Sequence, residues 1–121
     1  VTQSLSGNSY PVGQCTWYVY NRLVDAGSPA YNWLGNGQDW VRNLVAKGWK
    51  FSNTPVAGAV VSVAGGFGYT LPAYGHVAYV EYVNPDGSFL ISECNVSGVQ
   101  NKIHWAVWTN QTYYTFAIPP K

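Results

Sequence analysis

The chain has 121 residues, which is enough for one domain with one hydrophobic core. Apolar residues make up 47 % of the sequence, as is typical of a globular protein, whereas charged residues make up only 9 %, far below the usual quarter. The formal net charge is +1, and the sequence has neither a basic cluster nor an apolar run of membrane-spanning length, so we expect neither nucleic acid nor a membrane as a partner.

Two helices are predicted in the first half of the chain, after a polar, turn-rich stretch over residues 1–14. Residues 15–26 repeat apolar side chains at spacings of three and four and are followed by Gly27, a typical C-terminal stop. A second run with the same spacing covers residues 39–47 and ends at Gly48. These patterns predict two short helices separated by a loop.

The second half of the chain has the pattern of an antiparallel sheet. Strand-like runs cover residues 58–64, 76–83, 88–96, 102–108 and 112–118. The sequence NPDG between the second and third of these runs is a strong turn signal. Helices first, followed by strands with short connections, predict an α+β fold with N-terminal helices packed on an antiparallel sheet.

Few side chains in this sequence can carry out covalent chemistry. The thiols are Cys15 and Cys94, and the imidazoles are His76 and His104. Cys15 is the better candidate nucleophile, because the free N–H groups at a helix N-terminus stabilise a thiolate; a small buried core thiol is about equally compatible with the local pattern. His76 opens a strand after a glycine-rich loop, which is a suitable position for a general base, whereas His104 is expected to be a packed or surface histidine.

An orienting group for the imidazole is also available. Glu93 and Asn95 lie two residues apart on one predicted strand and therefore share a face, although a solvated strand end explains them equally well. If the NPDG loop is even-sized, His76 lies opposite Asn95 and diagonal to Glu93. A type I turn with a glycine bulge shifts the register by one residue and turns Glu93 away. A catalytic role for Glu93 therefore requires the first register or a compensating bulge.

The order of these motifs resembles one known family. The segments GQCTWYVYNR, NWLGNGQDW, YGHVAYVEYV and FLISECN follow one another as they do in CHAP domains, the cysteine- and histidine-dependent amidohydrolases/peptidases. The resemblance extends from about residue 10 to residue 119. It implies a papain-like fold of the NlpC/P60 type and hydrolysis of amide bonds in bacterial peptidoglycan. It also implies that residues 1–121 are one catalytic domain excised from a longer secreted or phage protein.

The resemblance assigns roles to individual residues. Cys15 would be the nucleophile and His76 the general base, with Glu93 orienting His76 and Asn95 helping to position the imidazole or the substrate. The backbone N–H of Cys15 and the side-chain amide of Gln14 are the expected oxyanion donors. Aromatic side chains suited to a substrate groove are Tyr10, Trp17, Tyr69, Tyr74, Trp105 and Trp108, although Trp17 and Trp108 fit a core better.

The remaining expectations concern cofactors, the second thiol and specificity. The sequence has no CxxC or HExxH motif and no carboxylate in residues 1–14, so we expect no metal and no other cofactor. A disulfide between Cys15 and Cys94 would block the nucleophile, so Cys94 is expected to be reduced and buried. Endopeptidase activity is slightly favoured over N-acetylmuramoyl-L-alanine amidase activity, in a monomer that is secreted or located at the cell wall. The alternative is a non-catalytic wall-binding or adhesion module, to which an aromatic content of 17 % is also suited.

Overall fold

The structure, a computed structural model, describes residues 8–10, 14–66, 75–96 and 99–120, with the backbone alone for residues 95, 96 and 99–102. Its helices are α1 at Cys15–Asp25, the short 3₁₀ helix η1 at Gly37–Asp39 and α2 at Trp40–Ala46. Within the described ranges, no helix is both long enough and apolar enough to cross a membrane.

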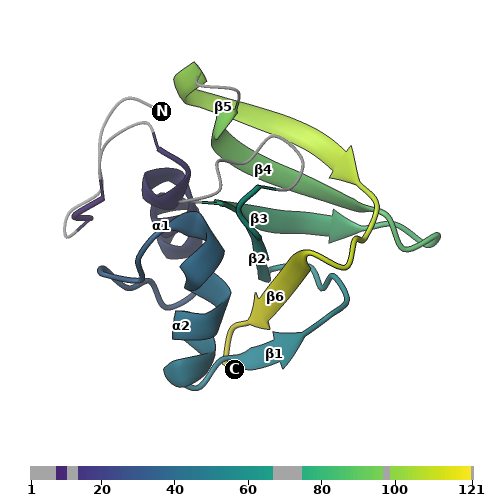
Figure 1. The fold of residues 1–121 in the computed structure, drawn as a ribbon, viewed down its shortest axis with the longest axis horizontal. Coiled ribbons are helices and arrows are strands. Elements are labelled where there is room, and N and C mark those ends of the chain that lie inside the picture. The colour runs from purple at the N-terminus through teal and green to yellow at the C-terminus, as the bar shows by residue number, and fades with distance from the viewer. Residues whose placement is uncertain (1–7, 11–13, 67–74, 97–98, 121) are drawn as a thin grey trace.

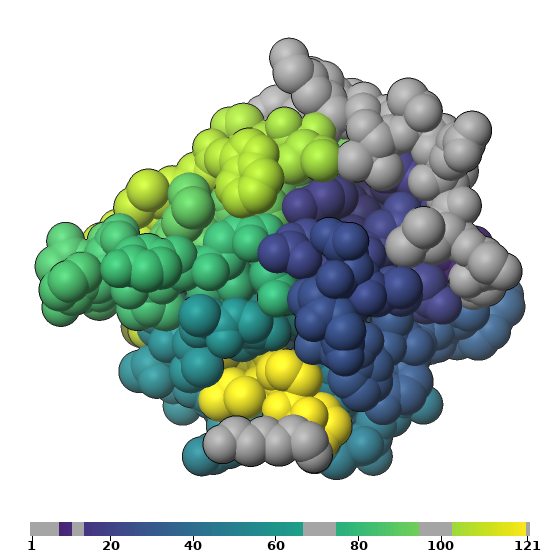
Figure 2. Space-filling model, turned by 180° about the vertical axis from the view of Figure 1, so that it is seen from behind, coloured from purple at the N-terminus to yellow at the C-terminus, as the bar shows by residue number. Residues whose placement is uncertain are grey.

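Within the described residues, six strands form one sheet in which every neighbouring pair is antiparallel. The strands are β1 (Lys50–Ser52), β2 (Val60–Val63), β3 (His76–Val83), β4 (Phe89–Val96), β5 (Val99–Trp108) and β6 (Tyr114–Ile118), in the spatial order β1-β6-β2-β3-β4-β5. Figure 1 shows the helices gathered at one side of the sheet, where α1 contacts β3 and β4 and α2 contacts β2 and β6. Seen from behind in Figure 2, the green hairpin of β3 and β4 protrudes from the body. The predicted α+β fold is confirmed.

Helix α1 is more deeply buried than its amphipathic pattern predicts. It begins at Cys15 because the backbone of the N-cap residue Gln14 is extended (φ −88°, ψ 165°), and Gly27 ends it with a positive φ of 77°. All of residues 16–21 are buried, since the sheet covers one side of the helix, Asn8 bonds to Trp17 and Asn21, and side chains of α2 belong to the same buried core. The start of α1 is thereby held firmly in the fold.

Alternate residues of the strands pack into two separate cores. Val77 and Cys94 lie in the helix-side core, together with buried side chains of α1 and α2. The opposite face of the sheet forms the far-side core: Ala59, Val61, Ala78, Val80, Phe89, Ile91 and Phe116. Since side chains alternate along a strand, His76 and Glu93, which are chain neighbours of Val77 and Cys94, project from the far side of the sheet.

The turn between β3 and β4 is of the bulged type. The Gly87 N–H donates to the Asn84 carbonyl at 2.9 Å, the Asn84 N–H donates to the Ser88 carbonyl at 2.8 Å, and Gly87 has a φ of 90°. Next to the turn, Val83 pairs with Phe89, which is the shifted register that would turn Glu93 away from His76.

A second bulge in β3 restores the register that a catalytic Glu93 requires. Glu81 is the extra residue, because Tyr82 pairs with Leu90 whereas Val80 pairs with Ile91. From Val80 toward the start of β3, the pairing therefore follows the unshifted register. The compensating bulge is present in the structure.

The side chain of Glu81 ties this bulge to α1. Arg22 donates to both carboxylate oxygens of Glu81, through Nε and Nη2, at 2.9 Å each, and the Ser92 hydroxyl donates to Oε2 at 2.6 Å. The Arg22 guanidinium also lies 4.5 Å from the centre of the Tyr79 ring. A bidentate pair of this kind is geometrically specific, so it holds the bulge against the helix.

The sequence patterns missed one strand and blurred one helix boundary. Strand β1 was not predicted, because its three residues have no alternating pattern and it depends on pairing with β6. The second helix, predicted at residues 39–47, is split into η1 and α2. Strand β3 has the predicted bounds, and each of the other predicted strands is present with one or both ends shifted by one to three residues.

Candidate active site

The thiol of Cys15 lies at the N-terminus of α1, where it contacts His76. Burial raises the pKa of Cys15. The hydrogen bond and charge of His76, together with the backbone N–H groups of Val77 and Thr16, lower the pKa by more than burial raises it, so the pKa lies below its ordinary value. This favours the thiolate, the form of cysteine that acts as a nucleophile. The side chain is only half-buried, so part of it remains accessible.

His76 is the first residue of β3 and is 5 % exposed. Burial lowers its pKa, but hydrogen bonds and charge interactions with Cys15 and Glu93 outweigh this and raise the pKa to about 9. Nε2 of the ring is engaged by Glu93, so the nitrogen left for the Cys15 contact is Nδ1. The two shifts together favour a thiolate–imidazolium pair at neutral pH.

Glu93 receives the imidazole from the neighbouring strand. The His76 Nε2 donates to Glu93 Oε1 at 2.6 Å, and Glu93 is completely buried. A short bond to an ionised carboxylate stabilises the protonated imidazole and fixes the direction of the ring. This diagonal contact between β3 and β4 is the one that the bulge at Glu81 makes possible.

Helix η1 supports the backbone of His76 from behind. A Cβ added at Gly37 would lie 2.4 Å from the carbonyl carbon of His76, and one added at Gly75 would lie 2.4 Å from both Gln38 Cβ and the Val63 oxygen. Gly75 also has a positive φ of 61°. Gly37 belongs to the quoted NWLGNGQDW segment, but a single sequence does not reveal that the glycine lies against a histidine 39 positions later.

Two of the other predicted site residues, Gln14 and Tyr10, lie in or next to the segments that hold the site. Gln14 is the N-cap of α1, directly before Cys15. Tyr10 is half-buried beside Trp40, and its hydroxyl donates to the Tyr31 carbonyl at 2.8 Å while accepting from the Leu34 N–H at 3.0 Å. Tyr10 thus braces the loop before η1.

Four further predicted residues are either buried or lie, wholly or by their side chain, outside the described part of the chain. Trp17 is 0 % exposed and lies in the helix-side core, so its ring is not available to a substrate in this structure. Tyr74 and the side chain of Asn95 lie outside the described residues, as does Tyr69. Cys94 is buried and forms no disulfide with Cys15, as expected.

His104 is an exposed residue of β5, as expected, but it also contacts the site, which was not predicted. It lies directly opposite Glu93 in the pairing of β4 and β5, and its Nδ1 is 2.9 Å from Glu93 Oε2. The sequence pattern missed this contact because it did not reveal the register in which β5 pairs with β4.

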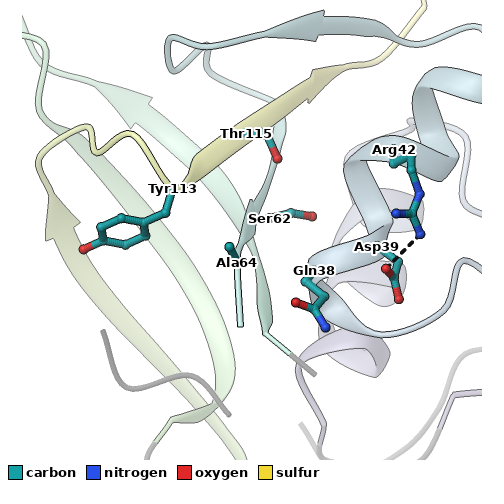
Figure 3. A pocket seen from close by; sticks show the side chains of 7 residues that line it. All are labelled: Gln38, Asp39, Arg42, Ser62, Ala64, Tyr113 and Thr115. Carbon is teal, nitrogen blue, oxygen red and sulfur yellow. Dashed lines mark hydrogen bonds and ion pairs between the residues drawn. The ribbon is translucent and has the colours of Figure 1, made fainter. Parts of the chain in front are cut away.

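A polar hollow lies elsewhere, between η1, α2 and the strands β2 and β6 (Figure 3). Its volume is about 420 Å³, and its lining residues are Gln38, Asp39, Arg42, Ser62, Ala64, Tyr113 and Thr115. Arg42 pairs with Asp39 at 2.9 Å, and Ser62 donates to the Gly37 carbonyl at 2.7 Å. None of the three residues Cys15, His76 and Glu93 lines this hollow. Among the described side chains, no group of three histidines, cysteines or carboxylates is arranged to hold a metal ion.

Comparison with known proteins identifies the family. The family model described as "CHAP domain" matches residues 5–95, about three quarters of the chain. The chain belongs to the CHAP domain family. The CHAP match includes Cys15, His76 and Glu93, the three residues whose side chains meet in the structure.

Relatives of this CHAP domain include named staphylococcal proteins. The chain is 42 % identical over 93 residues to staphylococcal secretory antigen SsaA of Staphylococcus epidermidis, and 36 % identical over 108 residues to N-acetylmuramoyl-L-alanine amidase sle1 of the same species. A crystal structure of an N-acetylmuramoyl-L-alanine amidase from Staphylococcus aureus superposes with a TM-score of 0.84 and 37 % identity over 98 % of this chain. The chain spans only about a third of these proteins: 33 %, 29 % and 34 % of their respective lengths.

Proposed function

We propose that this CHAP domain hydrolyses amide bonds of bacterial peptidoglycan through a cysteine–histidine–glutamate mechanism. The observation that supports this most strongly is the contact of Cys15, at the start of α1, with His76, which is itself held at 2.6 Å by the buried Glu93. A nucleophile, a base and an orienting carboxylate in this order form the arrangement that acyl-transfer enzymes need.

The proposed reaction starts from the thiolate of Cys15 and the imidazolium of His76. The thiolate attacks the scissile carbonyl, and the N–H groups at the start of α1, with the Gln14 amide, stabilise the oxyanion. His76 then donates its proton to the leaving amine, and the C–N bond breaks to give a thioester. Water attacks the thioester as His76 removes its proton; the C–S bond breaks, which releases the carboxylic acid and regenerates the Cys15 thiolate and the His76 imidazolium. Asn95 is proposed to help to position the imidazole or the substrate.

The substrate class follows from the family and from the names of the relatives. Two of the matched proteins are named N-acetylmuramoyl-L-alanine amidases, so amidase cleavage between the glycan and the stem peptide has support that the initially favoured endopeptidase cleavage lacks. Those names describe proteins about three times as long as this chain, whose activity can come from other parts of the protein. The identity of the bond cut by this domain is therefore part of the proposal. The name of a secretory antigen among the relatives supports action outside the cell, at the wall.

Product analysis on purified peptidoglycan tests the proposal. The protein is incubated with walls from staphylococci and other Gram-positive bacteria, and mass spectrometry identifies the released fragments. We expect new amine termini, with free stem peptides if the bond is that of an amidase and shortened or uncrosslinked peptides if it is that of an endopeptidase.

Two matched variants separate catalysis from binding. Cys15→Ala should abolish release, whereas Cys94→Ala changes the other thiol and should retain it. Full activity in the Cys15→Ala variant would overturn the mechanism. If the native protein bound to purified walls but released no amine termini, the domain would be a binding module instead of an enzyme.

A further inference from the structure

Glu93 makes contact with two histidines rather than one. Its Oε1 accepts from His76 at 2.6 Å, and its Oε2 lies 2.9 Å from the Nδ1 of His104 on β5. The carboxylate is 1 % exposed, whereas the His104 side chain is 51 % exposed, so His104 closes the side of Glu93 that faces away from His76. We propose that His104 is a positioning residue, which orients the carboxylate of Glu93 for its contact with His76.

The proposal rests on the freedom of a carboxylate to rotate. The terminal torsion of a glutamate is broad, so a bond to one oxygen alone fixes the plane of the carboxylate weakly. A second donor on the other oxygen sets that plane, and an ionised carboxylate accepts hydrogen bonds at both oxygens. Because Glu93 Oε2 is an acceptor, the Nδ1 of His104 carries the hydrogen in this contact.

The backbone supports the same geometry. Glu93 and His104 are directly opposite partners in the pairing of β4 and β5, and the preceding pair, Ser92 with Trp105, continues the same register. Side chains at opposite positions of an antiparallel pair lie on one face and close together. The contact therefore lies within the stretch of constant register that runs from the Phe89–Trp108 pair to the Cys94–Ile103 pair, and it does not depend on a loop.

This inference deepens the proposed function and depends on it for the kinetic part of its test. His104→Leu removes the donor while keeping a side chain of similar size. We expect kcat on peptidoglycan fragments to fall about ten-fold, the effect of one hydrogen bond to a charged group, with little change in KM. His104→Asn places an amide nitrogen near the position of Nδ1 and should restore most of the rate. His104→Gln places its nitrogen further out, near the position of Nε2, and should not restore it.

A second measurement is independent of hydrolysis. The titration of the His76 ring, followed by NMR, should shift to lower pH in the Leu and Gln variants and return in the Asn variant. Val107→Thr, at an exposed β5 position three residues away, is the control and should change neither readout. If the Leu variant does not fold, the comparison of Asn with Gln decides.

The outcomes are distinct. Unchanged kcat and unchanged His76 titration in the Leu and Gln variants, or equal losses in Asn and Gln, would overturn the positioning role. A native protein that releases nothing from peptidoglycan would overturn the proposed function, while the NMR titration would still test His104.

Discussion

Replacing Glu93 by glutamine removes the negative charge beside His76 but keeps the size of a fully buried side chain. The raised pKa of His76, about 9, depends partly on the 2.6 Å contact with Glu93. A hydrogen bond to a charged group contributes about 1.5–3 kcal/mol, and one pKa unit corresponds to about 1.4 kcal/mol. Loss of the charge therefore predicts a fall of about one to two units in the pKa of His76.

The sign of the effect on activity follows from the role of the imidazolium. His76 must be protonated to donate to the leaving amine, and it is protonated below its pKa. The alkaline limb of kcat/KM should accordingly move from near the His76 pKa of about 9 to about pH 7–8 in Glu93→Gln. The assay is a pH series of the initial rate on soluble peptidoglycan fragments.

A matched carboxylate serves as the control for this experiment. Asp86→Asn makes the same chemical change in the turn between β3 and β4, where the partner is Ser88 rather than His76. It should leave the alkaline limb in place. An alkaline limb that is the same in Glu93→Gln and in the native protein would refute the assignment of Glu93 as the group that stabilises the imidazolium.

Two further substitutions test how the fold positions this site. Gly37→Ala introduces a Cβ within 2.4 Å of the His76 backbone and should lower kcat/KM by up to about 100-fold. The control is Gly27→Ala, whose Cβ would have nothing within 4 Å; it should cost about 1 kcal/mol of stability and leave activity unchanged. Equal activities in the two variants would contradict the close packing of η1. Arg22→Ala removes the bidentate partner of Glu81 and should lower the free energy of unfolding in urea by about 1–3 kcal/mol. As the control, Arg42→Ala breaks an exposed pair with Asp39 and should change the free energy of unfolding by less than about 0.5 kcal/mol. Similar losses of stability in the Arg22 and Arg42 variants would argue against a stabilising role for the Arg22–Glu81 pair.

Local patterns predicted the elements of this fold better than their contacts. The helix that starts at Cys15 and strand β3, which starts at His76, were both located from spacing and from flanking glycines. Strand β1 was missed, because its three residues acquire their conformation from pairing with β6. Patterns of period two or 3.6 report which face of an element is buried, not which element lies beside it.

The register between β3 and β4 shows where sequence reasoning reached its limit. The NPDG turn suited two registers, and the structure contains both, one on each side of Glu81. The bulge depends on the contact of Glu81 with Arg22, 59 positions earlier, which no local pattern reveals. The contacts of Gly37 with His76 and of His104 with Glu93 were missed for the same reason: each joins segments that only the folded chain brings together.

The most direct test of an activated nucleophile is the pH dependence of Cys15 alkylation. Iodoacetamide labelling is followed by mass spectrometry in the native protein and in His76→Ala, with the buried Cys94 as an internal reference that should stay unlabelled while the protein is folded. We predict that Cys15 in the native protein reacts with a midpoint below the ordinary thiol pKa of about 8.5. In His76→Ala the midpoint should rise to that value or above, because His76 no longer offsets the rise in the Cys15 pKa that burial causes. A native Cys15 that titrates as an ordinary or raised thiol would contradict the proposed catalytic pair.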